Sequence, residues 1–135
     1  MDSFRGSCLC QSVTYEATGE VQGFYLCHCS HCRKISGSAH GANIFIKVQS
    51  FNWLTGEDKI SHYNLQNTRF EKAFCPNCSS TLPVLRGNGH AVIPAGSLDS
   101  DFSIKPNAHI HYASRMGWDH DLEKIKTFQE LPDND

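Results

Sequence analysis

The sequence predicts an all-β fold, and three observations support this. Short runs in which apolar and polar residues alternate recur along the 135-residue chain, as is typical of strands with one buried face. Clusters of Gly, Pro, Asn and Asp separate these runs and indicate turns. No long segment shows the 3.6-residue period of an amphipathic helix. A chain of this length is expected to form one domain with a modest core.

The expected strands follow from the alternation. They cover residues 12–18, 42–48, 59–65, 68–74, 90–94 and 109–113. In the first, Val13, Tyr15 and Ala17 share one face, and in the second Ile44 and Ile46 do. These faces should meet in the core, together with the aromatic residues in or beside the strands, which we expect to pack there by default. Those aromatic residues are Phe24, Tyr25, Phe45, Phe51 and Phe70, and Trp118 is expected to have a packing role as well.

The remaining segments are expected to be turns, one short helix and a tail. Turns are indicated at residues 55–58, 87–89 and 106–107. The best helical candidate is 122–128, and a single helical turn is expected after Cys32. We expect one domain over residues 1–120 and a C-terminal extension over 121–135, whose acidic end, 132–135, should be frayed.

Composition excludes several classes of function. The 12 Lys and Arg residues nearly balance the 14 Asp and Glu residues, and no basic stripe is present, so nucleic acid is not an expected partner. Apolar stretches are far too short to span a membrane. Residues 1–7 lack the apolar core of an export signal, so we expect a cytoplasmic protein. Thiols stay reduced there, and clustered cysteines indicate metal sites, or less readily redox dithiols, rather than disulfides.

The 7 cysteines fall into three tight clusters, and none stands alone. A tetrahedral zinc site needs four ligands, so seven cysteines suggest one closed site and one site with an open position. Two of the clusters are cysteine pairs, and each pair would supply two ligands. This favours both pairs binding the same structural zinc. That site would comprise Cys8, Cys10, Cys75 and Cys78.

The central cluster provides three thiolates, Cys27, Cys29 and Cys32, within six residues. A second zinc held there would keep one position for an incoming ligand, as catalytic zinc sites do. The alternative is that His28 or His31 completes the shell and makes a second structural site. Residues inside such a loop tend to point away from the metal, so we expect both histidines to be hydrogen-bond partners of the ligands instead. The other histidines show no metal-ligand spacing and are expected on the surface or on strand faces; they are His40, His62, His90, His109, His111 and His120.

An open three-thiolate zinc favours a sulfur donor in its vacant position. A thiol bound there is deprotonated at neutral pH, which suits reactions that make or break carbon–sulfur bonds. Arg33 and Lys34 follow the cluster directly and could bind the carboxylates of a small anionic ligand. The alternative, that both are ordinary surface cations on a solvated loop, is equally compatible with the sequence.

These motifs together resemble the glutathione-dependent formaldehyde-activating (GFA-like) family. The resemblance rests on Gly6-Ser7-Cys8-Leu9-Cys10, Val13-x-Tyr15, Cys27-His28-Cys29-Ser30-x-Cys32-Arg33-Lys34 and Phe74-Cys75-x-x-Cys78. It continues through Trp53-Leu54-Thr55-Gly56 with Tyr63, then Gly96-Ser97-Leu98-Asp99, Pro106, His109-Ile110, Ser114-Arg115 and Trp118. It covers about residues 6–118, and all seven cysteine positions are filled at the spacing of the family.

The resemblance implies a β-tent, in which stacked antiparallel sheets are pinned by a four-cysteine zinc site. It also implies two zinc ions per chain, a structural one on the first and last cysteine pairs and a labile, catalytic one on the central triad. The activity implied is that of a carbon–sulfur lyase that joins formaldehyde to glutathione and forms S-hydroxymethylglutathione. The partner would be a small thiol such as glutathione. The alternative function is a non-catalytic zinc module that binds a protein partner.

The chain departs from the family at two positions. Gln11 and Ser79 stand where family members usually have Gly after each structural pair. Glycine there would allow a positive φ beside the metal, so we expect Gln11 and Ser79 either to adopt that conformation at a modest cost or to strain the site.

Overall fold

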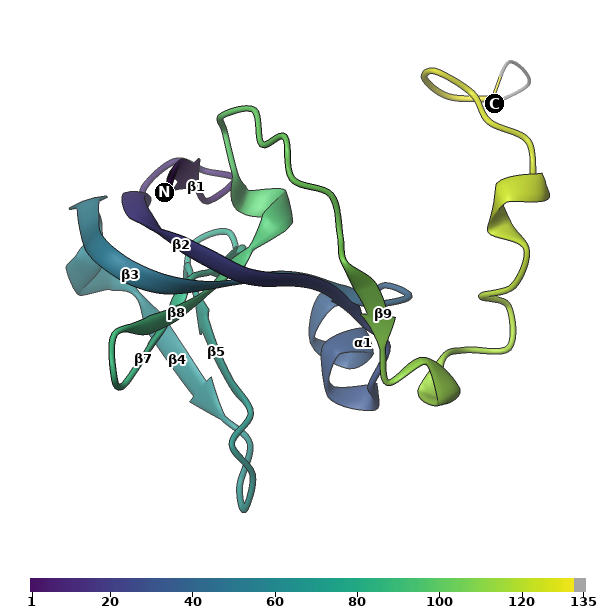
Figure 1. The fold of residues 1–135 in the computed structure, drawn as a ribbon, viewed down its shortest axis with the longest axis horizontal. Coiled ribbons are helices and arrows are strands. Elements are labelled where there is room, and N and C mark those ends of the chain that lie inside the picture. The colour runs from purple at the N-terminus through teal and green to yellow at the C-terminus, as the bar shows by residue number, and fades with distance from the viewer. Residues whose placement is uncertain (133–135) are drawn as a thin grey trace.

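The computed structural model of the chain describes residues 1–132 and confirms the all-β prediction (Figure 1). The larger sheet has the order β1 (Asp2–Ser7), β2 (Thr14–Cys27), β3 (Gly41–Thr55), β8 (His90–Pro94), β7 (Val84–Arg86), all antiparallel, and β9 (Ala108–Ile110) adds to β2 in parallel. The smaller antiparallel sheet has the order β4 (Ser61–Asn64), β5 (Glu71–Phe74), β6 (Thr81–Leu82). Helix α1 (Ser30–Ser36) connects β2 to β3, and short 3₁₀ turns occur at Glu57–Lys59, Ala95–Ser97, Tyr112–Ser114 and Leu122–Lys124.

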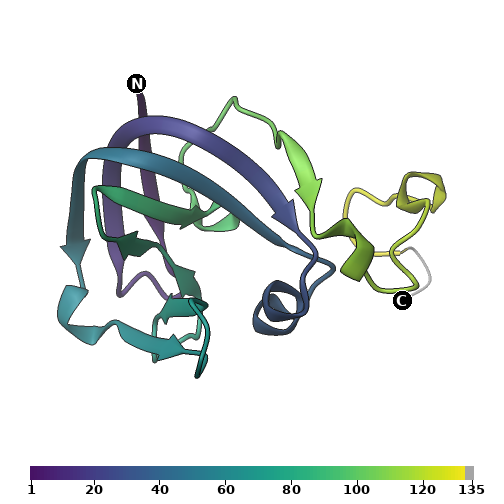
Figure 2. The same cartoon turned by 60° about the horizontal axis from the view of Figure 1, so that its bottom comes forward.

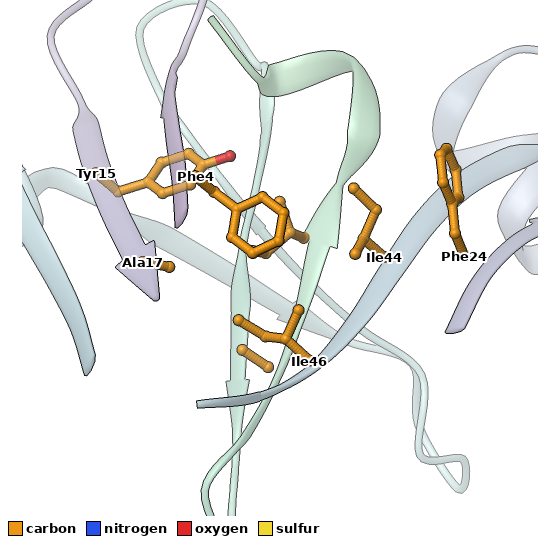
Figure 3. Close-up of a cluster of buried hydrophobic side chains, with 8 residues drawn as sticks. Phe4, Tyr15, Ala17, Phe24, Ile44 and Ile46 are labelled. Carbon is orange, nitrogen blue, oxygen red and sulfur yellow. The ribbon is translucent and has the colours of Figure 1, made fainter. Parts of the chain in front are cut away.

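The larger of two core clusters lies on one face of the larger sheet (Figure 3), and the smaller one surrounds Cys8 and Cys75 beside the smaller sheet. The alternation predicted for β2 and β3 is observed in the larger cluster, because Tyr15 and Ala17 are buried, as are Ile44 and Ile46. The Tyr15 hydroxyl lies 2.6 Å from Ser97 Oγ, so its one polar atom has a partner inside the core. The other members of this cluster are Phe4, Phe24, Ala91 and Ile93.

Strands β2 and β3 are much longer than the alternation predicted. Their pairing contains register shifts between Thr18 and Gly19 and again between Val21 and Gly23. Each such irregularity changes which face the next residue occupies, so the period-two signal breaks although the strand continues. The two strands arch across the molecule as a long curved pair (Figure 2).

The first strand, β1, was not predicted because one of its inward positions is a glycine. A Cβ at Gly6 would overlap the hydroxyl end of the Tyr15 ring, which occupies the space that a side chain would need. Only Phe4 therefore marks the buried face of this strand in the sequence.

Two helix predictions were wrong in extent. The segment 122–128 forms only a 3₁₀ turn at Leu122–Lys124, and its residues are exposed, so no packing partner stabilises a longer helix. The turn expected after Cys32 is instead a seven-residue helix that starts before it, with Cys29 as N-cap and Gly37 at φ 65° as C-cap.

The C-terminal segment leaves the two sheets after β9 and extends away from them (Figures 1 and 2). Apolar residues along it are exposed, including Trp118 at 59%, so the packing role expected for Trp118 is wrong. The end expected to be frayed lies outside the described residues from 133 onward. Within residues 1–132, no helix is both long enough and apolar enough to cross a membrane.

Candidate metal centres and the adjoining cavity

Four cysteine sulfurs gather where the two sheets meet. The Sγ atoms of Cys8, Cys10, Cys75 and Cys78 all lie within 4.8 Å of one another. The first pair lies in the connection between β1 and β2, and the second in the connection between β5 and β6. A metal held by this group would tie the larger sheet to the smaller one.

The two connections that carry these cysteines are built alike. The backbone N–H of Gln11 donates to Cys8 O at 3.0 Å, and that of Ser79 donates to Cys75 O at 2.7 Å. Gln11 and Ser79 both have φ 67°, the left-handed conformation expected at these positions. Each costs about 1 kcal/mol relative to a glycine in this region of φ.

Hydrogen bonds make two of these sulfurs acidic. The Ser12 hydroxyl lies 3.0 Å from Cys10 Sγ, and this contact is the main reason that the pKa of Cys10 is lowered to about 5. A hydrogen bond with Ser80 likewise lowers the pKa of Cys78 to about 7. Burial raises the pKa of Cys8. Thiolates grouped this closely need a cation to balance their charge, and four sulfurs match the donor set of a closed tetrahedral zinc site.

The other three cysteines form a second group. Cys27 ends β2, Cys29 caps α1, and Cys32 lies in its first turn, and their Sγ atoms all lie within 4.8 Å of one another. Burial raises the pKa of Cys27 and of Cys32. Burial by itself would raise the pKa of Cys29 as well. Hydrogen bonds outweigh this effect and lower its pKa overall, among them one from Cys32 N at 3.4 Å. A soft cation such as zinc would relieve the cost of holding three sulfurs together as thiolates, so the donors fit zinc.

Neither histidine of this loop belongs to the group. Both ring nitrogens of His28 have other neighbours, since Nδ1 lies 3.0 Å from Asp119 Oδ2 and Nε2 lies 2.8 Å from His109 Nδ1. The ring of His31 packs edge-on against Phe70, with centroids 5.3 Å apart. In the part of the chain that the structure describes, no histidine, cysteine or carboxylate joins the three sulfurs as a fourth ligand.

Cys27 and Cys32 open onto a cavity of about 400 Å³. Its walls come from the second face of the larger sheet, from α1 and from the β5–β6 region. Three aromatic residues expected in the core line it instead, namely Tyr25, Phe45 and Phe70. The volume is within the usual range for a small-molecule site.

Arg33 and Lys34 are not on the walls of this cavity. The guanidinium of Arg33 donates to Met116 Sδ at 3.0 Å, and Lys34 is exposed. The cations that do line the cavity are Lys72 and Arg86, for which the sequence offered no signal. They lie far from the cysteine triad along the chain and reach the cavity only through strand pairing.

Two histidines expected on surfaces or strand faces lie beside the triad loop. His40 lines the cavity, and burial followed by the neighbouring His28 lowers its pKa. His109 lies on β9 and bonds to His28. Asp119, the buried partner of His28, was missed because no spacing pattern connects it to the cysteines.

Comparison with known proteins agrees with this architecture. The profile of the family described as glutathione-dependent formaldehyde-activating enzyme matches residues 3–114, a range that includes both cysteine groups. A crystal structure of a Rhodobacter sphaeroides protein is similar in fold, with a TM-score of 0.59 at 16% sequence identity, over 73% of this chain and 91% of that one. No curated protein matches the sequence.

Proposed function

The chain belongs to the family of glutathione-dependent formaldehyde-activating enzymes, and from this we propose that it is a zinc-dependent carbon–sulfur lyase acting on a thiol–aldehyde adduct. The observation that carries the proposal is that two of the three grouped sulfurs, Cys27 and Cys32, open onto a cavity large enough for a small molecule. A purely structural metal site would have no use for that access.

In this proposal the two cysteine groups have different roles. The group at the junction of the sheets holds a structural zinc, whose binding contributes folding free energy on the order of 10 kcal/mol. Cys27, Cys29 and Cys32 hold a labile zinc through three ligands. Zinc bound there would supply a Lewis acid that keeps a substrate thiol in its thiolate form at neutral pH. A cytoplasmic location would keep all seven cysteines reduced and available.

The reaction has simple stoichiometry. The thiol sulfur attacks the carbonyl carbon of the aldehyde, one carbon–sulfur bond forms, and the proton of the thiol ends on the carbonyl oxygen. The reverse reaction breaks the same bond. The chain's contribution is to orient the thiol through the walls of the cavity and to limit access of water, which raises the effective concentration of the two reactants. Formaldehyde and glutathione, named in the family description, are the reference pair.

The test is to measure zinc per chain before and after mild chelation, with and without glutathione. We expect about two zinc ions per chain, of which one leaves readily and responds to added thiol. Adduct formation must exceed the uncatalysed rate and must fall with the loss of the labile zinc. If both ions resist chelation and neither responds to thiols, the proposal is wrong.

A second candidate function is a zinc module that binds a protein partner. The observation that favours it is the set of exposed apolar residues along the C-terminal segment, Met116, Trp118, Leu122, Ile125, Phe128 and Leu131. Removing residues 121–135 takes away four of these six side chains, Leu122, Ile125, Phe128 and Leu131. A lyase should then retain its labile zinc and its adduct chemistry, whereas a binding module should bind its partner much more weakly.

A further inference from the structure

The larger sheet carries apolar side chains on both of its faces. In β3, Ile44 and Ile46 point into the core, and Phe45 between them lines the cavity on the other side. In β8, Ile93 is buried in the core, and its neighbour Val92 lines the cavity. An antiparallel sheet with one face on the core usually presents a polar second face to water.

These outward residues form a continuous apolar surface across the strands. Phe45 pairs with Val92, which in turn pairs with Val84, so the three form one row across β3, β8 and β7. The ring of Tyr25 on β2 extends the row, with its centroid 5.9 Å from that of Phe45. All four residues line the cavity. Only part of this surface is covered by α1 and the smaller sheet, since a cavity of about 400 Å³ is left between them.

The same alternation places the cysteine triad at the end of this surface. Cys27 follows Tyr25 by two residues on β2 and lines the same cavity. A molecule whose sulfur lay at the triad would therefore have to lay the rest of its body against the row that contains Phe45. Apart from the bond of its sulfur at the triad, burial of carbon rather than hydrogen bonding would supply most of its affinity.

The charged groups of the cavity point to a ligand with one negative charge. Lys72 and Arg86 line it together with a single acid, Glu71. Neither cation forms an ion pair within the described residues. Lys72 lies instead with its Nζ 3.5 Å from Ile35 O and over the ring of Phe74. The balance of these three side chains is one positive charge.

We propose that the substrate thiol of this protein is an aromatic or branched aliphatic thiol carrying one carboxylate, with its apolar body on the Phe45 row, rather than glutathione. This inference rests on the proposed function and names its substrate class. Glutathione carries two carboxylates, an ammonium group and two amides, and each would lose hydrogen bonds to water against walls made mostly of carbon. Phe45 is thus a specificity-determining residue.

Calorimetric titration of the zinc-loaded protein with four thiols tests the proposal. The main probe is 2-mercapto-3-phenylpropanoate; 2-mercaptopropanoate lacks its ring, 2-phenylethanethiol lacks its carboxylate, and glutathione is the fourth. We expect the main probe to bind tightest. Loss of the ring should weaken binding on the order of tenfold to a hundredfold. Loss of the carboxylate should weaken it about tenfold or less, since the cations are partly solvated.

Variants test whether the apolar row that contains Phe45 is the part of the cavity that binds the ring of the main probe. Phe45→Ala should weaken binding of the main probe about tenfold and leave 2-mercaptopropanoate within about twofold. Leu85→Ala is the matched control, because Leu85 lies on β7, is exposed and does not line the cavity. If Phe45→Ala does not fold, as judged by circular dichroism and zinc content, Val92→Thr introduces a hydroxyl into the same row at nearly constant volume and should act in the same direction.

The outcomes separate this inference from the function on which it rests. If glutathione binds tighter than the phenyl thiol, or if Phe45→Ala and Val92→Thr bind the phenyl thiol as the native protein does, the inference is overturned while the lyase proposal stands. If no thiol binds and the labile zinc ignores all four, both fail together.

Discussion

The imidazole of His28 and the carboxylate of Asp119 lie 3.0 Å apart and are both buried, at 1% and 8% exposure. One belongs to the loop of the cysteine triad and the other to the segment that follows β9. Nδ1 of His28 faces this carboxylate, and Nε2 of the same ring shares a hydrogen bond with His109 Nδ1 at 2.8 Å. The triad loop is thereby attached to two later parts of the chain.

Replacing Asp119 with Asn should loosen the triad without removing a ligand. The buried imidazole would lose its charged partner, at a cost of about 1–3 kcal/mol of unfolding free energy. Because partners of a ligand loop orient it, zinc at the triad should be lost to a chelator about tenfold more readily. Asp121→Asn is the control, since the Asp121 carboxylate is exposed and lies 3.8 Å from Lys124 Nζ, its one ion-pair partner among the described residues. Equal chelation profiles for the two variants would contradict the role of this contact.

The two cysteine groups should respond differently to single substitutions. Cys75→Ser removes a ligand from the group that ties the sheets together, so the chain should unfold or become insoluble. Cys29→Ser should leave a folded protein that has lost its labile zinc and its adduct-forming activity. Thermal unfolding measures the stability of the two variants, and zinc content measures the loss of metal from each. The same loss of stability in the two variants would contradict the division into a structural and a labile site.

Tyr15 should make the protein sensitive to alkali. Burial raises the pKa of this phenol from 10.0 to about 12, so above pH 10 the unfolded chain releases a proton that the folded chain keeps. Stability from this group is complete below pH 10 and is lost between pH 10 and about 12, by roughly 3 kcal/mol.

Tyr15→Phe removes that titration and provides the comparison. At pH 8 the variant should be less stable than the native chain by about 1 kcal/mol, because the 2.6 Å contact with Ser97 is lost. The difference should shrink or reverse by pH 11. Denaturant unfolding of both proteins at pH 8 and pH 11 measures this difference in stability. If both proteins lose the same stability between the two pH values, Tyr15 is not responsible for the sensitivity to alkali.

Gly6→Ala should destabilise the fold because a Cβ at this position would overlap the Tyr15 ring. Either β1 or the ring must move, and overpacking of this kind costs about 1–3 kcal/mol. Gly87→Ala is the matched control, since no atom lies within 4 Å of a Cβ built there. A denaturant midpoint unchanged by Gly6→Ala would argue against the tight approach of β1 to Tyr15.

Glycine at the two left-handed positions should stabilise the protein. Gln11→Gly and Ser79→Gly would each relieve a side chain held at φ 67°, a gain of up to about 0.5 kcal/mol after the greater freedom of glycine in the unfolded chain is counted. Ser50→Gly, in the exposed part of β3, should instead cost about 0.5–1 kcal/mol. Destabilisation by all three glycines alike would mean that neither position is strained.

The sequence by itself determined the features that depend on neighbouring residues. The alternation in residues 12–18 and 42–48 identified the buried faces around Tyr15 and Ile44, because successive side chains of a strand point to opposite sides. Cysteine spacing showed which sulfurs one turn can bring together. Because two of the clusters are cysteine pairs with two ligands each, the sequence also suggested that these pairs share one metal site. The positive φ of Gln11 and Ser79 was one of two outcomes expected from the resemblance to the family, whose members usually have Gly at both positions.

Only the tertiary structure decided which distant residues meet. Asp119 reaches His28, and Lys72 and Arg86 reach the cavity beside Cys27, through strand pairing and the path of the chain after β9, for which no local pattern exists. Phe45 was expected in the core by default, as an aromatic residue in a strand, although the alternation put it on the face opposite Ile44 and Ile46. That second face is apolar as well and borders a cavity. Whether an apolar side chain packs in a core or lines a site depends on what covers it, and that is set by the arrangement of the sheets and α1 rather than by the strand itself.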